Sequence, residues 1–246
     1  MAGDHVDVHV RVRSEARLGL LSQGSTKVYK TPSKDVCTEQ LLTATIDEGA
    51  ALLQLPDPVQ PFKGSSYRQS QSFYVHPRYS NLVLLDWVSA GRTARGEGWE
   101  FFQWKGRNEV WSLPMKTSTG KTAPEKLLMR DSIVLDGTSS MEQSYRDEMD
   151  DLGVFGTLII RGPVFHTLSQ LFMKEFSSQP RIRGGSPGPT APPSRLTWTA
   201  ASMRGFVIVK FGAKEVDEAK RWLREMLDCD GTVAREFGQH SLMCLQ

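Results

Sequence analysis

Three carboxylates of this sequence, Asp86, Glu97 and Asp131, stand where an acidic side chain could do chemistry. Asp86 follows the apolar run 82–85 and precedes a Trp-Val pair, so it lies inside a predicted strand. A carboxylate there is costly unless it is paired or in contact with water. Glu97 stands between two glycines, where an exposed backbone can present it, and Asp131 precedes another apolar strand. Each acid therefore needs a partner, water or a function.

Three explanations of these acids remain open. The simplest is a structural network of ion pairs that joins Asp86, Arg92, Glu97, Arg130 and Asp131. Arg95 is a further candidate partner for Asp86. In the second, some of the carboxylates line a hydrated passage for a divalent cation, because oxygen ligands and retained water hold a transition metal weakly. The third is a β-rich hydrolase, in which one carboxyl group has a raised pKa and another stays ionised.

Three other patterns fail to predict an enzyme or a metal site. Residues 120–122 read Gly-Lys-Thr, as at the end of a phosphate-binding loop, but Met115 replaces the glycine that this loop requires. Residues 184–188 match Gly-x-Ser-x-Gly, yet they lie in a Pro/Gly-rich loop and not at a strand-to-helix turn. The His-Asp-His alternation of residues 5–9 could bind nickel or zinc, but it is more typical of a solvated strand face.

The composition is that of an ordinary soluble protein. Of the 246 residues, 39% are hydrophobic and 24% are charged, and a net charge of +2 predicts no nucleic-acid or membrane partner. Three widely spaced cysteines argue against a disulfide framework and against a structural zinc site. No apolar run reaches the length of a membrane span, and the N-terminus lacks an apolar signal core. We expect a cytoplasmic protein.

Short strands fill the first two thirds of the chain. Residues 5–13 alternate valine with polar residues, which predicts a strand with one buried face. Since no strand–helix alternation is present, we expect a mainly β fold of stacked-sheet or β-solenoid-like architecture, and not a doubly wound parallel sheet. Runs rich in β-branched or aromatic residues predict the other strands at 18–21, 26–30, 41–46, 72–75, 82–88, 99–104, 109–111, 132–135 and 157–161.

Two helices are predicted in the C-terminal third. Residues 163–176 and 214–227 each place apolar side chains on one helical face. The Pro, Gly and Ser content of residues 177–194 predicts a flexible loop, and residues 205–211 read as a buried strand. In the run 99–104 apolar side chains point to both faces, which predicts cover by a second sheet layer or by a partner protein.

A glycine interrupts two strand segments in the stretch Gln23, Gly24 and Ser25. Such a glycine is typical of a bulge or of a close backbone approach. Lys27 and Tyr29 continue on the strand that follows. From composition alone, a hairpin or bulge that serves only packing is the simpler reading of this stretch.

An ordered series of unusual motifs resembles the UreD family, also called UreH, of urease accessory proteins. The resemblance is specific from about residue 3 to residue 137 and becomes loose after residue 156. The motifs are ARLGLLSQGSTKVYK at 16–30, LLQLPDPVQPFKG at 52–64, LLDWVSAGRTARGEGWEF at 84–101, NEVW at 108–111 and LLMRDSIVLDG at 127–137.

The resemblance implies a single domain over residues 1–246 that catalyses nothing itself. It would be a metallochaperone scaffold that helps to insert nickel into apo-urease, in a complex with UreF and the GTPase UreG, with nickel only in transit. The implied nickel path contains Asp4, which matches the acidic end of a glycine-rich family motif, together with Asp86 and Glu97. The implied partner-binding or tunnel-lining residues are Gln23, Gly24, Ser25, Lys27, Tyr29, Arg92, Arg130 and Asp131.

Members of the family carry further strands before the glycine-rich segment. We therefore expect this chain to be N-terminally shortened, with an open sheet edge beside residues 6–12. Two alternatives to the chaperone remain: the hydrolase with paired carboxylates, and a plain protein-interaction module without a metal role.

Overall fold

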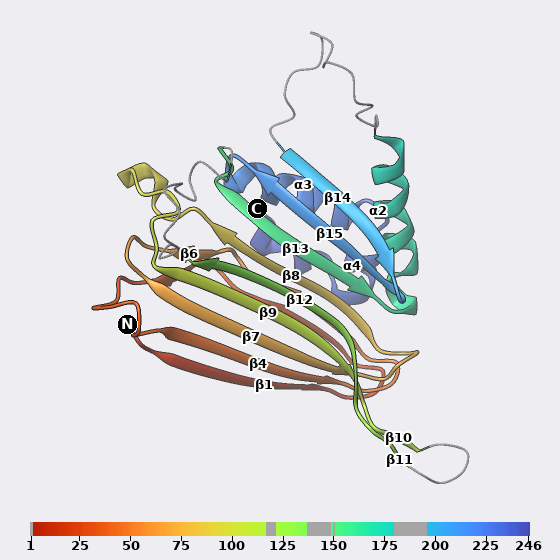
Figure 1. The fold of residues 1–246 in the computed structure, drawn as a ribbon. Coiled ribbons are helices and arrows are strands. Elements are labelled where there is room, and N and C mark those ends of the chain that lie inside the picture. Colours follow the sequence, from red (N-terminus) through yellow and green to blue (C-terminus); the bar gives the residue numbers. More distant parts are fainter. Residues whose placement is uncertain (1, 117–121, 137–148, 150, 180–195) are drawn as a thin grey trace.

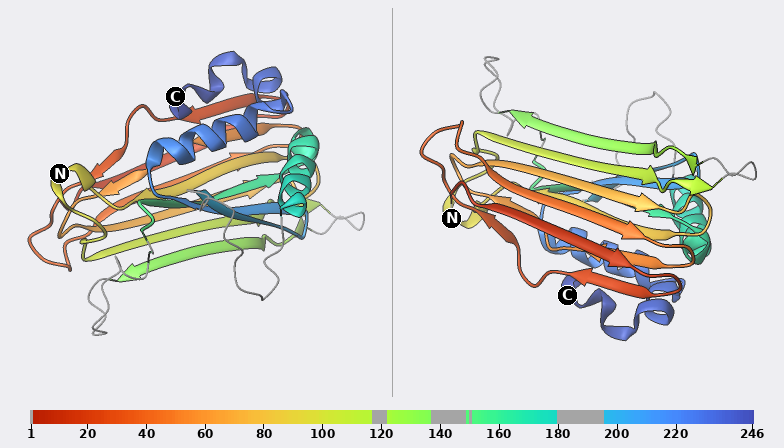
Figure 2. Two further views of the ribbon diagram at one scale, coloured as in Figure 1. Left: turned by 90° about the horizontal axis from the view of Figure 1, so that it is seen from above. Right: turned by 90° about the horizontal axis from the view of Figure 1, so that it is seen from below.

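The structure is a computed structural model that describes residues 2–116, 122–136, 149, 151–179 and 196–246. Two β-sheets stack face to face, and helices cover the outer face of one of them (Figures 1 and 2). The mainly β, stacked-sheet fold expected from the sequence is therefore confirmed, as are helices in the C-terminal part.

The first sheet has five strands and carries the N-terminal strand at one edge. Its strands, in spatial order, are β1 (His5–Val12), β4 (Thr38–Ile46), β7 (Ser66–Val75), β9 (Gln103–Ser112) and β12 (Lys126–Asp136). Among the described strands β1 pairs only with β4, so its other edge is open, and Val6 on this strand is 48% exposed.

The second sheet has eight strands and lies between the first sheet and the helices (Figure 2). Its main path is β14 (Leu196–Met203), β15 (Phe206–Ala213), β13 (Val154–Arg161), β8 (Asn81–Ser89), β5 (Ala51–Leu55) and β2 (Arg17–Leu21). Beside this path, β6 (Val59–Pro61) pairs with β3 (Thr26–Val28) and with β8. A separate two-stranded ribbon joins β10 (Met115–Lys116) to β11 (Thr122–Ala123).

The chain winds between the two sheets as a solenoid does. It passes from β1 to β2, from β4 to β5 and from β7 to β8. Successive coils pair in parallel, β1 with β4 and β4 with β7 in one sheet, and β2 with β5 and β5 with β8 in the other. Parallel neighbours need a crossover connection, and here a strand of the opposite sheet supplies it in place of a helix. One inward-facing ladder across the first sheet consists of Val8, Leu42, Gln71 and Asn108.

The two helices predicted from apolar periodicity are confirmed, and three short ones, at residues 93–95, 232–237 and 239–245, were not predicted. Their shared core with the eight-stranded sheet contains an aromatic cluster in which Trp198 of β14 lies 5.3 Å from Trp222 between ring centroids. Phe172 contacts both tryptophans edge-on. The helices are η1 (Thr93–Arg95), η2 (Pro163–Phe165), α2 (His166–Ser178), α3 (Val216–Asp228), α4 (Thr232–Phe237) and η3 (Gln239–Leu245).

The strand predicted at residues 99–104 is wrong over its first four residues. Trp99 adopts a left-handed φ of 57°, which turns the chain, and β9 begins only at Gln103. The aromatic cover expected there comes from this chain itself, because Trp99 stacks on Phe155 with ring centroids 5.7 Å apart. Trp99 also donates a 2.7 Å hydrogen bond from Nε1 to the carbonyl oxygen of Leu152.

Several sequence predictions fall on residues that the structure does not describe. These are residues 180–194 of the predicted loop, which include the Gly-x-Ser-x-Gly match, and residues 120–121 of the phosphate-loop match. Among the described helices, none combines the length and the apolar character that crossing a membrane requires.

Candidate functional site

Polar side chains cross the otherwise apolar interior between the two sheets. Successive side chains of a strand alternate between its faces, so β8 directs Leu84, Asp86 and Val88 toward the five-stranded sheet. Leu84 and Val88 belong to two separate apolar clusters, and Asp86 lies between them. We call the interior side chains that connect around this carboxylate the polar belt: Gln54, Gln69, Gln71, Asp86 and Asn108.

Asp86 accepts two hydrogen bonds from amide groups on the opposite sheet. Nε2 of Gln69 on β7 lies 2.9 Å from Oδ1, and Nδ2 of Asn108 on β9 lies 2.6 Å from Oδ2. The carboxylate is 4% exposed, and no cationic group of the described residues lies within 4.0 Å of it. Two neutral amides thus replace the arginines expected from the sequence.

The rest of the polar belt continues from Asn108 across both sheets. Gln71 donates to Oδ1 of Asn108 at 2.9 Å, and Gln54 on β5 donates in turn to Oε1 of Gln71. Oε1 of Gln54 is buried without a hydrogen-bond donor among the described residues. On the other side, the hydroxyl of Tyr67 lies 3.1 Å from Oε1 of Gln69. A connected line of oxygen and amide groups therefore spans the interior.

Burial raises the pKa of Asp86, because removing a carboxylate from water disfavours its charged form. The amides of Asn108 and Gln69 oppose this effect by donating to the charged form. Asp131 raises the pKa further and Lys210 lowers it, so both charges act on Asp86 from nearby. Asp86 is thus a carboxylate whose charge depends on its immediate surroundings.

Asp131 and Lys210 form an ion pair at the rim of the interior. Nζ of Lys210 on β15 lies 2.8 Å from Oδ1 of Asp131 on β12 and 3.4 Å from the hydroxyl of Thr157 on β13. Oδ2 of Asp131 is buried and has no donor among the described residues. A hollow of about 300 Å³ lies beside this pair and is lined partly by Thr157, Lys210 and Ile133.

Glu97 is neutralised at a different place on the molecule. It forms a two-pronged ion pair with Arg92, whose Nε lies 2.9 Å from Oε2, and it accepts a hydrogen bond from the backbone of Lys63. These contacts, with Arg92 the main cause, hold the pKa of Glu97 below its usual range. The guanidinium of Arg92 also lies 4.1 Å above the ring of Phe62, which Tyr29 contacts edge-on. This group is a surface cluster.

The stretch from Gln23 to Ser25 is held in place by Asp57, a buried residue in the segment between β5 and β6. Gly24 adopts a left-handed φ of 87° and donates its backbone N–H to Oδ2 of Asp57 at 2.8 Å. Oδ1 of Asp57 lies 2.6 Å from Nζ of Lys220 on α3. The side chains of Gln23 and Lys27 stay exposed, so the stretch is a fixed turn on the surface.

The remaining predicted residues lie apart from the polar belt. Asp4 is exposed, and its carbonyl oxygen accepts the backbone N–H of Glu39. Arg130 pairs with Glu109 at 2.8 Å on the outer face of the first sheet. The single ion-pair network considered from the sequence is therefore wrong: Asp86 accepts from two amides, Glu97 pairs with Arg92, and Asp131 pairs with Lys210.

The described residues bring no metal-binding cluster together. Within the described part of the chain, no three His, Cys, Asp or Glu side chains gather to hold a metal ion. His5 lies 3.4 Å from Glu39 and His9 lies 3.3 Å from Asp7, all on the solvated face of the first sheet. The solvated strand face expected for residues 5–9 is what forms.

Sequence reasoning missed the amides of the polar belt. In β7, Gln69 and Gln71 have the same alternation parity as the buried Phe73 and Val75. Polar residues at core positions were therefore visible once the strand was extended toward its N-terminal end, and the prediction that began at residue 72 hid them.

Comparison with known proteins relates this chain to a family of accessory proteins. The family model described as UreD urease accessory protein matches residues 1–243. An uncharacterized ureD-like urease accessory protein of Schizosaccharomyces pombe is 29% identical over 227 residues, which cover 92% of this chain and 76% of that protein. Urease accessory protein 4 of Cryptococcus neoformans is 28% identical over 262 residues, covering 95% and 76%.

A plant relative, urease accessory protein D of Oryza sativa subsp. indica, is 34% identical over 163 residues, which cover 66% of this chain and 48% of that protein. The match of the family model extends over nearly the whole chain, including the part after residue 156 where the motifs become loose. The chain therefore belongs to the UreD family of urease accessory proteins.

Proposed function

We propose that this protein is a non-catalytic scaffold that conducts nickel to the urease apoprotein, in a complex with UreF and the GTPase UreG. Membership of the UreD family supports a role in urease maturation. The observation that carries the finer proposal is Asp86, a buried carboxylate between the sheets whose hydrogen-bond donors among the described residues are two neutral amides. A buried acid without a cationic partner suits a passing cation.

The groups of the polar belt suit nickel that passes through, and not nickel that stays bound. Its groups are carboxylate and amide oxygens, which bind divalent nickel less tightly than imidazole or thiolate groups do. Oε1 of Gln54, which has no donor among the described residues, adds an acceptor that a hydrated cation can use. Weak, successive oxygen contacts let an ion enter and leave, as delivery to another protein requires.

We place the entrance to this route at the ion pair of Asp131 and Lys210. Asp131 keeps one oxygen without a donor among the described residues, and the side chain of Lys210 beside it is 49% exposed. We place Asp131 before Asp86 on this route, because Asp131 lies at the rim beside the half-exposed Lys210 and Asp86 is buried between the sheets. Asp4 and Glu97 lie outside this interior line, so we assign them at most to the surface of the complex.

The decisive experiment replaces Asp86 by asparagine. Asp86→Asn keeps the shape of the side chain and removes its charge. The new NH2 group then faces the NH2 group of Gln69 or of Asn108, and these two facing donors cost about 1–3 kcal/mol at most. We expect urease activation by the co-expressed accessory proteins to fall roughly tenfold or more, since changing even a partner of a metal ligand costs about 10–100-fold. Melting temperature and UreF binding are measured on the same variant.

The matched control is Asp7→Asn, which removes a half-exposed carboxylate from the outer face of the first sheet. It should leave activation unchanged. Full urease activation with Asp86→Asn would remove this residue from the nickel route. Loss of the fold and of UreF binding together would instead assign Asp86 a purely structural role.

A further inference from the structure

A hollow of about 500 Å³ lies at one end of the eight-stranded sheet, away from the polar belt. Figure 1 shows the end of β13, the start of α2 and the turn between β14 and β15 meeting there. Three arginines line it, Arg78, Arg161 and Arg204, together with His166. No Asp or Glu is among its lining residues. The volume is within the usual range of small-molecule sites, about 300–1,000 Å³.

Arg161 is a buried cation whose hydrogen bonds are incomplete. The residue is 7% exposed, and its guanidinium lies 4.7 Å above the ring of Phe206. It donates to the carbonyl oxygen of Pro77, but its Nε has no acceptor among the described residues. Burial lowers the pKa of Arg161. None of the described carboxylates forms an ion pair with Arg161, and a buried cation without a partner is costly, so a bound anion would lower that cost.

Two exposed arginines flank the same hollow. Arg78 lies in the loop between β7 and β8, and Arg204 lies in the two-residue turn between β14 and β15. Neither is within ion-pair distance of a carboxylate of the described residues. Arg204 adopts a left-handed φ of 51°, at a turn position that Asn or Asp fills at less cost. Three positive charges around one hollow repel one another, and a bound anion relieves that repulsion.

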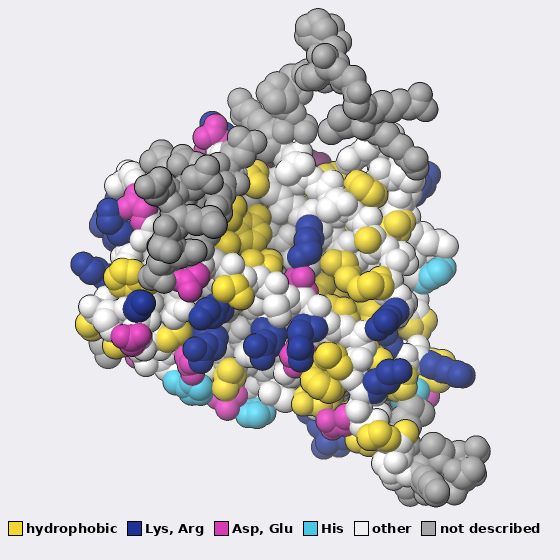
Figure 3. All heavy atoms as spheres, in the orientation of Figure 1, with side chains coloured by type: hydrophobic (Ala, Val, Ile, Leu, Met, Phe, Trp, Pro, Cys, Tyr) yellow, Lys and Arg dark blue, Asp and Glu magenta, His cyan; other side chains and the backbone are white. Residues whose placement is uncertain are grey.

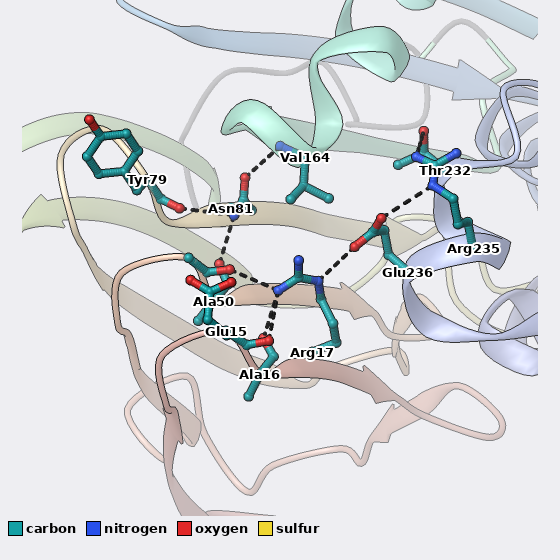
Figure 4. A network of polar contacts seen from close by, with 11 residues as sticks. Glu15, Ala16, Arg17, Ala50, Tyr79, Asn81, Val164, Thr232, Arg235 and Glu236 are labelled. Atoms are coloured by element: carbon teal, nitrogen blue, oxygen red, sulfur yellow. Dashed lines mark hydrogen bonds and ion pairs between the residues drawn. The ribbon is translucent and has the colours of Figure 1, made fainter.

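The walls of the hollow are fixed by Asn81 at the start of β8 (Figure 4). Its Nδ2 donates at 3.0 Å to the carbonyl oxygens of Tyr79 and Ala50, which holds the loop that carries Arg78. Its Oδ1 accepts the backbone N–H of Val164 in η2 at 2.8 Å, which holds the start of α2. The site is therefore formed before a ligand arrives, which lowers the entropic cost of binding.

We propose that this hollow binds a small phosphomonoester, a phosphoryl group on a compact organic body. A phosphoryl dianion offers three oxygens and up to two negative charges, which matches several guanidinium forks better than one carboxylate does. The organic body would lie against the apolar part of the lining, Met173, Phe206 and Pro163. This inference does not depend on the nickel route, because the two sites share no residue.

Calorimetric titration of the purified protein with phenyl phosphate tests the proposal. Because Arg161 is buried and its removal could unfold the chain, the variants are the exposed Arg78→Ala and Arg204→Ala. Each should weaken binding by about tenfold or more, the scale expected for a lost charge-assisted hydrogen bond. Thermal melting of each variant, which should match that of the wild type, shows that the fold is intact.

The control variant is Arg107→Ala, in a second basic hollow on the outer face of the first sheet. This hollow is lined partly by Arg68, Lys105 and Arg107, and Figure 3 shows Lys and Arg side chains gathered in the part of the view where Figure 1 places that sheet. Arg107→Ala should leave phenyl phosphate binding unchanged. The assignment is overturned if the wild type does not bind, or if only Arg107→Ala weakens binding.

Two further titrants test the ligand class. Benzoate carries the same ring with a single negative charge, and inorganic phosphate carries the anion without a body. Both should bind more weakly than phenyl phosphate. If benzoate binds as tightly as phenyl phosphate, the hollow does not recognise the phosphoryl group. If inorganic phosphate binds as tightly as phenyl phosphate, the hollow does not recognise an organic body.

Discussion

Asp57 shows how one buried side chain can organise a surface turn. It is 3% exposed, and its two carboxylate oxygens bind different elements: Nζ of Lys220 on α3, and the backbone N–H of Gly24. Its own backbone N–H donates to the hydroxyl of Ser22 at 2.7 Å. The left-handed φ of Gly24 lets its N–H reach Asp57 at little steric cost, as glycine allows. The surface stretch matched to the family thus rests on a buried ion pair.

Removing Lys220 should therefore destabilise the protein strongly. Lys220→Met leaves the Asp57 carboxylate buried without a cation, which costs about 3–5 kcal/mol when one partner of a buried pair is lost. Urea unfolding, followed by the fluorescence of the tryptophans, measures this change.

Lys214→Met is the matched control for this variant. Lys214 lies 4.0 Å from Asp151, and both side chains are largely exposed, so its loss should change stability by less than about 1 kcal/mol. Equal unfolding midpoints for the two lysine variants would mean that water replaces the cation at Asp57.

Strand β13 sets the packing between the eight-stranded sheet and the helices. It pairs antiparallel with β8 on one side and with β15 on the other. Gly156 at its centre leaves room for two large rings, because an added Cβ would lie 2.4 Å from Cβ of Trp87 and 2.7 Å from Cζ of Phe211. The carbonyl oxygen of Asp86 would lie 2.9 Å away. This element therefore depends on the absence of one side chain.

Gly156→Ala should destabilise the fold by about 1–3 kcal/mol, the usual cost of overpacking a core. The control is Gly19→Ala in β2, where an added Cβ meets nothing within 4 Å. That change should be neutral, or stabilising by up to about 1 kcal/mol, because alanine restricts the unfolded chain. Thermal unfolding of both variants checks the difference, and a Gly156→Ala protein as stable as Gly19→Ala would show that the rings repack freely.

At the scale of the whole molecule, local patterns predict elements but not their neighbours. Alternation predicts β1, where valines share one face, and it fails for β5, whose five residues are all buried and do not alternate. The partners of Asp86 lie 17 and 22 residues away, on strands whose parallel register no local pattern encodes. The sequence could therefore place Asp86 in an apolar strand, while its amide partners depend on how the solenoid winds.

One ion pair joins the first coil of the solenoid to the helices near the end of the chain. Nε of Arg17 on β2 lies 2.9 Å from Oε2 of Glu236 on α4, across 219 residues of sequence (Figure 4). Arg17 also donates to the carbonyl oxygens of Gly49 at 2.9 Å and Glu15 at 3.1 Å. The same guanidinium thus holds the turn before β5 and helix α4, which contacts the edge strand β2.

Replacing Arg17 should loosen both ends of the chain in a pH-dependent way. Arg17→Leu should cost about 1–2 kcal/mol near neutral pH, from the lost ion pair and the lost bonds to carbonyl groups. Arg17 is the main cause that lowers the pKa of Glu236 below its ordinary value of 4.5. A carboxyl with a depressed folded pKa contributes stability above its unfolded pKa and loses it as the pH falls through the folded pKa.

The difference in unfolding free energy between wild type and Arg17→Leu should therefore shrink as the pH falls below about 4.5. It should not vanish, because the hydrogen bonds to Gly49 and Glu15 do not titrate. Urea unfolding of both proteins across this range measures the difference. Arg13→Leu, at an exposed arginine without an ion pair among the described residues, should show no such trend. A difference that stays constant with pH would mean that Arg17 acts through the carbonyl groups alone and that Glu236 contributes nothing to closing the molecule.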